Sequence, residues 1–174
     1  MAKFFLRKKV GDRVVNGHPW IFGNEIGDSE GEFEAGDIVE VYSYNGSFIG
    51  KGYINPASQI RIRLVTRDKD EVVNDQFFYN RIKEAWEYRQ QIGYIENCRL
   101  IFGEADQLPA LIIDKFNDYF VIQTLALGID KWKPAIVAAI EKIFKPKGIY
   151  ERNDVPVREL EGLAQQKGFL SAPF

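Results

Sequence analysis

Cysteine and histidine are almost absent from this sequence of 174 residues, which has one of each, Cys98 and His18. A disulfide within the chain is therefore excluded, and a zinc site built from cysteine and histidine lacks ligands. No apolar run reaches the roughly 18–20 residues that a bilayer span needs. The apolar stretch that follows Met1 is also too short for a secretory signal. These absences predict a cytoplasmic protein with no metal site and no membrane segment.

Hydrophobic residues make up 45% of the chain, and aromatic residues are abundant, with 13 Phe, 8 Tyr and 3 Trp. This composition excludes a disordered chain and supplies enough apolar surface for a sizeable core. The length suits one domain or two small ones. The formal net charge is only −2. Overall charge therefore identifies no partner.

The small net charge conceals segregated charges. Residues 1–13 carry Lys3, Arg7, Lys8, Lys9 and Arg13 against one aspartate, and residues 51–67 carry Lys51, Arg61, Arg63 and Arg67. Residues 25–40 contain seven acidic side chains and no basic one. If strands bring the two basic segments together, they form a surface that attracts phosphates. The alternative is an ordinary solvated surface.

Residues 1–70 have the pattern of a compact β domain. Strands are expected at 4–9, 38–42 and 48–53, and Asn45-Gly46 is the preferred pair for a two-residue hairpin turn between the last two. Residues 59–65 alternate polar and apolar side chains with period two. That alternation predicts that Arg61 and Arg63 lie together on the face opposite the core.

The periodicity changes after residue 70. Apolar residues at helical spacing predict helices at 75–92 and 132–144, and strands are expected at 99–102, 110–114, 119–124 and 148–151. Residues 71–152 therefore form a small α+β domain with the order helix, strands, helix, strand, and the fold class of the chain is α+β. Residues 153–174 are polar and rich in glycine and proline, and no closing element is predicted there.

No group of residues predicts a catalytic site. Cys98 and His18 fall in different predicted domains, and Cys98 is expected to be a small apolar residue at a strand edge. The glycines at 50 and 52 lack the third glycine and the following helix of a dinucleotide site. Glu104 and Asp106 lie in a turn, where capping is the simpler interpretation.

Nucleic-acid binding is the hypothesis that the residues favour, because basic side chains occur beside aromatic ones and this combination suits phosphate contacts and base stacking. The candidate RNA-binding residues are Lys3, Arg7, Lys9, His18, Trp20, Phe22, Lys51, Tyr53, Arg61 and Arg63. For His18, Trp20 and Phe22 the alternative is structural packing.

Four segments carry a resemblance to a known family. They are 17–22 (GHPWIF), 50–56 with 58–60 (GKGYINP and SQI), 99–109 (RLIFGEADQLP), and 149–154 with 158–163 (IYERND and RELEGL). In this order they resemble the N-terminal PUA and central domains of the ribosomal RNA large subunit methyltransferase I family. Gln107 departs from the pattern, since the family usually has glycine there.

The resemblance implies a PUA-like β barrel at 1–70, a central α+β domain at 71–152 and an exit segment at 153–174. It further implies a Rossmann-like catalytic domain that binds S-adenosylmethionine and methylates cytosine C5 in 23S ribosomal RNA. This chain ends before such a domain, so no catalytic or cofactor-binding residue is assigned here. Its expected partners are ribosomal RNA and its own methyltransferase domain, with a homodimer left open. The alternative is a stand-alone PUA-type RNA-binding module without activity.

Overall fold

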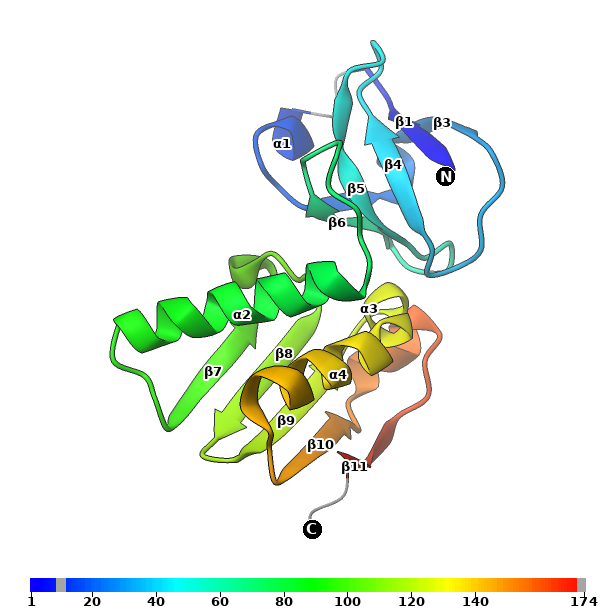
Figure 1. Cartoon of the computed structure of the whole chain (residues 1–174). Helices are drawn as coiled ribbons and strands as arrows, with labels where there is room; N and C mark the ends of the chain where they lie inside the picture. The colour runs from blue at the N-terminus through cyan, green and yellow to red at the C-terminus, as the bar shows by residue number, and fades with distance from the viewer. Residues whose placement is uncertain (9–11, 172–174) are drawn as a thin grey trace. The chain divides into compact units, whose positions relative to one another are not determined.

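The computed structural model describes residues 1–8 and 12–171 and divides the chain into two compact units. The N-terminal unit is Met1–Glu71, and the C-terminal unit begins at Val72 (Figure 1). Among the described residues, no helix has the length and apolarity to cross a membrane, and no cluster of potential metal ligands is found.

One sheet of six strands curls into a half-barrel in the N-terminal unit. Its elements are β1 (Lys3–Leu6), α1 (Asp12–Val15), β2 (Trp20–Phe22), the 3-10 turn η1 (Gly23–Glu25), β3 (Ile26–Glu30), β4 (Ile38–Tyr42), β5 (Phe48–Ile54) and β6 (Ile60–Thr66). The strand order is β2-β6-β5-β4-β1-β3, and only the β1–β4 pair is parallel. The β4–β5 hairpin is confirmed, although residues 43–47 form a longer loop than the predicted two-residue turn.

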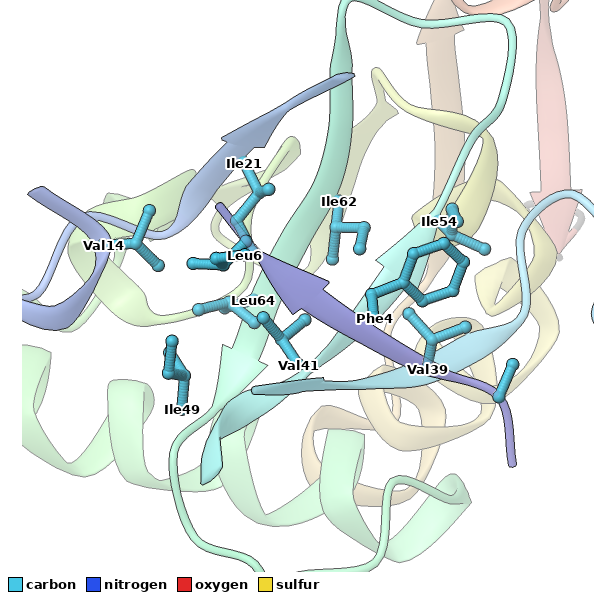
Figure 2. Close-up of a cluster of buried hydrophobic side chains, with 11 residues drawn as sticks. Phe4, Leu6, Val14, Ile21, Val39, Val41, Ile49, Ile54, Ile62 and Leu64 are labelled. Atoms are coloured by element: carbon cyan, nitrogen blue, oxygen red, sulfur yellow. The ribbon is translucent and has the colours of Figure 1, made fainter. Parts of the chain in front are cut away.

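The concave side of this sheet encloses the core of the unit. Alternate residues point inward, as Phe4 and Leu6 of β1 and Val39 and Val41 of β4 do in Figure 2. The predicted inward residues Ile62 and Leu64 are buried, whereas Ile60 is only half-buried. Ile60 lies at the beginning of β6 and pairs with Phe22, where the register between β2 and β6 shifts by one residue.

Two glycines allow β5 and β6 to pair closely. A Cβ added at Gly52 would lie 2.2 Å from the carbonyl oxygen of Arg63, and one at Gly50 would lie 2.5 Å from that of Thr66. Any side chain at these positions would push the strands apart. The glycines of segment 50–52 therefore serve strand packing.

The C-terminal unit has one sheet of five strands in the order β11-β10-β9-β8-β7. Its elements are α2 (Asp75–Gln91), β7 (Asn97–Phe102), the 3-10 turn η2 (Gly103–Asp106), β8 (Leu111–Phe116), β9 (Tyr119–Thr124), α3 (Leu127–Lys131), α4 (Lys133–Phe144), β10 (Gly148–Asn153), the 3-10 turn η3 (Pro156–Glu161) and β11 (Gln166–Ser171). Helices α2 and α4 pack side by side over one face of the sheet (Figure 1).

In the turn at 103–107 the structural interpretation is confirmed for Asp106. Asp106 accepts a hydrogen bond from the backbone N–H of Phe102 and pairs through both oxygens with Arg89, at 2.9 and 2.7 Å. Gln107 has φ of 59°, in the left-handed region that favours glycine. This conformation gives a physical reason for glycine at the equivalent position of the resembling family.

The prediction of no closing element after residue 152 was wrong. β11 pairs antiparallel with β10 and forms one edge of the sheet. The segment that leads to it is held by Arg158, which is 1% exposed and donates to the carbonyl oxygens of Thr124 and Ala164. A polar edge strand has little apolar periodicity, so its sequence did not indicate a strand.

Candidate nucleic-acid interface

The turn between α1 and β2 is ordered by hydrogen bonds around His18. Its Nδ1 lies 2.6 Å from Nη1 of Arg13 and 3.1 Å from the backbone nitrogen of Trp20. Both of these nitrogens are donors, so Nδ1 acts as the acceptor. The ring also packs edge-on against Trp20, with centroids 5.4 Å apart. His18 therefore orders the turn that leads into β2.

Arg13 and Glu25 form a closed ion pair at the base of this turn. Nη2 of Arg13 lies 2.9 Å from both carboxylate oxygens of Glu25, which is 6% exposed. One of these oxygens also accepts the backbone N–H of Phe22 at 2.7 Å. The Arg13 guanidinium lies over the Phe22 ring, 5.2 Å from its centroid. The charge of Arg13 is therefore largely compensated, and the pair holds Phe22 in place.

Arg61 lies near Arg13, but among the described residues no carboxylate compensates its charge. It projects from β6 beside Gly23, where an added Cβ would approach its Nη2 to 3.0 Å. Its Nε is buried without a hydrogen-bond partner, and across residues 1–8 and 12–171 its guanidinium forms no ion pair. A buried donor without a partner costs roughly 1–3 kcal/mol.

An open pocket of about 540 Å³ surrounds this guanidinium. It is lined by Arg13, Phe22, Gly23, Asn24, Glu25, Gln59 and Arg61. The lining combines one aromatic ring, two amide side chains and an uncompensated cation. Such a pocket can hold a planar base next to an anionic group.

Arg63 and Tyr53 lie in register with Trp20 across β2, β6 and β5. The Arg63 guanidinium is 5.7 Å from the centroid of the Trp20 ring. Arg63 is 8% exposed and Tyr53 is 2% exposed, whereas Trp20 is half-buried. Arg63 therefore supports the Trp20 ring from within the domain.

The other candidate residues lie outside this pocket. Lys51 is 6% exposed, and its ammonium donates to the carbonyl oxygens of Lys69 and Glu71 at 2.6 and 2.7 Å. Lys3 is exposed on β1, and Arg7 donates from Nε to the carbonyl oxygen of Ile26. Lys9 lies outside the described residues. The two basic segments meet in the pocket through Arg13 and Arg61.

Five lining residues were not predicted as site residues from the sequence: Arg13, Gly23, Asn24, Glu25 and Gln59. The Arg13–Glu25 pair joins residues 12 positions apart across a turn, which no periodicity indicates. Asn24 is a single polar residue in the 3-10 turn η1, and Gln59 is one in the loop before β6. The one available signal was the basic segment 1–13, to which Arg13 belongs.

Comparison with known proteins agrees with this architecture. Residues 4–67 match the PUA-like domain family. The chain is 40% identical over 172 residues to ribosomal RNA large subunit methyltransferase I of Aliivibrio fischeri, covering 97% of this chain and 43% of that protein. It is 36% identical to the Klebsiella pneumoniae protein of the same name, covering 89% of this chain and 40% of the relative.

Over most of its own length the chain is similar to ribosomal RNA large subunit methyltransferase I. It spans less than half the length of the relatives it matches. A solved structure from Streptococcus mutans, described as a candidate SAM-dependent methyltransferase, superposes with a TM-score of 0.75 at 16% sequence identity. The superposition covers 99% of this chain and 43% of that chain. A second methyltransferase structure, complexed with SAH, gives a TM-score of 0.72 at 17% identity and covers 87% of this chain. At these identities the two structures establish the fold.

S-adenosylmethionine, the cofactor implied by these relatives, does not fit the one parallel strand–helix–strand unit that the described residues contain. β9 continues into α3 through Leu125 and Ala126, without the glycine-rich turn that nucleotide-type cofactors use. The space beside this turn is filled by the buried guanidinium of Arg158. No step through the cofactor is therefore assigned to these residues.

Proposed function

We propose that this chain is the RNA-binding, substrate-recognition portion of a SAM-dependent methyltransferase that modifies cytosine C5 in 23S ribosomal RNA. The PUA-like match and the relatives' names support a ribosomal RNA substrate. In this proposal, the methyl donor binds in the part of the relatives that this chain does not span. In the same proposal, the N-terminal unit binds the RNA.

The observation that carries the proposal is the uncompensated Arg61 in a pocket next to an aromatic ring. Arg13 is neutralised by Glu25 and Lys51 donates to backbone carbonyls, so neither supplies a free positive charge. Arg61 retains its charge and a buried Nε–H without a partner. A phosphate oxygen or a base carbonyl in the pocket can pair with this charge, because guanidinium groups bind such acceptors through several N–H donors.

The aromatic side chains beside Arg61 supply the second half of the interaction. Phe22 lines the pocket, and Trp20 lies two residues earlier on the same strand and is half-buried. An unpaired base that stacks on such a ring gains roughly 1–3 kcal/mol. The amides of Asn24 and Gln59 can then hydrogen-bond the edge of that base. The pocket therefore suits an unpaired nucleotide better than a regular duplex.

The test measures binding of a mixed-sequence single-stranded RNA to the full chain by fluorescence anisotropy. Affinity should fall steeply as salt rises from about 50 to 300 mM, because binding releases counterions. Arg61→Gln should weaken binding about tenfold or more, since a charge-assisted contact is worth roughly 1.5–3 kcal/mol. Combining Arg61→Gln with Arg63→Gln should weaken it further.

Lys3→Gln is the matched control, because it removes the same charge from an exposed side chain that lies outside the pocket. It should change the affinity less than about threefold, as a distant surface charge is largely screened. A salt-independent affinity, or equal losses in the Arg61 and Lys3 variants, would refute the pocket. Thermal unfolding of each variant separates lost binding from lost folding.

A further inference from the structure

A second surface of the N-terminal unit consists of aromatic rings from three adjacent strands. Phe5 of β1 pairs with Tyr42 of β4, and Tyr42 pairs with Phe48 of β5. The Phe5 and Tyr42 rings are stacked with centroids 5.5 Å apart, and Tyr42 and Phe48 meet edge-on at 5.6 Å. We refer to this row, with its neighbours on the same side of β3, β1 and β4, as the aromatic face.

The aromatic face is the outer side of the sheet. Phe4, Leu6, Val39 and Val41 point into the core in Figure 2. Residues that alternate with them must point the opposite way, which places Phe5 and Tyr42 outside. All three rings of the row are half-buried. Each therefore presents part of its surface to a partner.

The charges on this face exclude a polyanion. The strand register places Asp28 beside Phe5, and places Glu30 and Glu40 on either side of Lys3. Strands β3, β1 and β4 therefore contribute three carboxylates and one ammonium to the face. Lys51 of β5 lies beside Glu40, but its ammonium donates to two backbone carbonyls. The following loop adds Glu32, Glu34 and Asp37. RNA would be repelled here, whereas a cationic partner would be attracted.

The rings of this region already contact cations within the chain. Nζ of the exposed Lys3 lies 6.0 Å from the centroid of the Tyr42 ring, and Nζ of Lys8 lies 5.6 Å from that of Tyr44. These distances are near the outer limit of a cation–π contact, so a cation from a partner can replace them. Arginine suits the face best, because a guanidinium stacks on an aromatic ring and pairs with a carboxylate at the same time.

We propose that the aromatic face binds an arginine-rich segment of another protein. The stacked rings accept guanidinium groups, and the flanking carboxylates pair with their N–H donors. This surface uses the acidic segment 25–40, which has no role in the RNA pocket apart from Glu25. The proposal does not depend on RNA binding, since the two surfaces share no residue.

The test compares two nine-residue peptides with the same charge, Gly-Arg-Gly repeated three times and Gly-Lys-Gly repeated three times. Each is titrated into the ¹⁵N-labelled full chain, and chemical-shift changes are recorded. The arginine peptide should bind about fivefold more tightly, because only guanidinium gains both stacking and paired hydrogen bonds. The changes should centre on residues 3–6, 28–30 and 40–48.

Two variants test the two halves of the proposal. Tyr42→Leu should abolish the preference for arginine, and Asp28→Asn with Glu30→Gln should weaken both peptides. Controls are Tyr88→Leu and Glu84→Gln with Glu96→Gln, which change exposed residues of the C-terminal unit and should change neither affinity. The unperturbed ¹⁵N spectrum of each variant reports its folding.

Two results would overturn the proposal. Equal affinity for the two peptides, or equal losses in the controls, would mean that the acidic charge alone attracts cations. Shifts at the aromatic face on addition of the mixed-sequence RNA, with none on addition of the peptides, would identify RNA as the occupant.

Discussion

Replacing Arg158 should destabilise the C-terminal unit by about 3 kcal/mol, because its guanidinium is buried with a specific set of partners. It is 1% exposed and donates to Asp130 at 2.9 Å, to the carbonyl of Ala164 at 3.0 Å and to Thr124. Removing one partner of a buried pair usually costs roughly 3–5 kcal/mol. We expect the lower end of this range, because Asp130 would still have two partners after the substitution. They are the Lys133 ammonium at 3.1 Å and the Thr124 hydroxyl at 2.6 Å.

The assay is guanidinium unfolding followed by circular dichroism at the helical band. Helices α2 and α4 supply most of that signal, and both belong to the C-terminal unit. Arg158→Met retains most of the side-chain volume, so a loss close to that of Arg158→Ala would assign the energy to the polar contacts rather than to a cavity. This comparison separates the two causes.

Arg152 provides the matched control because it is also paired with an aspartate, Asp154, at 2.9 Å. Its side chain is 56% exposed, and exposed pairs contribute little. Arg152→Ala should therefore change the free energy of unfolding by less than about 0.5 kcal/mol. If Arg158→Ala cost less than about 1 kcal/mol, the inference that buried contacts fix η3 and β11 would be refuted.

Two further predictions concern pH and strand packing. Burial raises the pKa of Asp130, but hydrogen bonds from Thr124, Arg158 and Lys133 outweigh this effect and lower it below the ordinary value of 3.8. Because the folded pKa is the lower one, its stabilising contribution is complete above pH 3.8 and declines as pH falls toward the folded pKa. The stability difference between the native chain and Arg158→Ala should therefore shrink below about pH 4, as measured by unfolding at several pH values. Gly52→Ala should destabilise the N-terminal unit by about 3 kcal/mol or more, since its Cβ would meet the Arg63 carbonyl oxygen at 2.2 Å. Gly46→Ala, with open space and φ of 82°, should cost only about 1–2 kcal/mol in the same thermal unfolding assay; equal costs would contradict the close-approach argument.

Local pattern in the sequence was sufficient for most of the elements. The alternation over 59–65 predicted β6 with Ile62 and Leu64 inside, and the helical spacing over 75–92 predicted α2, which the structure places at Asp75–Gln91. Both signals arise because one face of each element is buried, so apolar residues recur with the period of the backbone. The resembling segments added the PUA-like assignment of the first domain, which the match at 4–67 confirms.

Tertiary structure decided which positive charges remain without a partner and which strand forms the edge of the sheet in the C-terminal unit. Arg13, Arg61 and Lys51 look alike in the sequence, yet one is paired with Glu25, one lacks a partner for its buried Nε and one donates to two carbonyls. β11 has few apolar residues, and it forms a strand because its backbone pairs with that of β10. The physical reason is the same in both cases. Apolar periodicity is a property of residues close together in the sequence, so it can be recognised there. Hydrogen bonds and ion pairs join residues that are distant in the sequence and meet only in the folded chain.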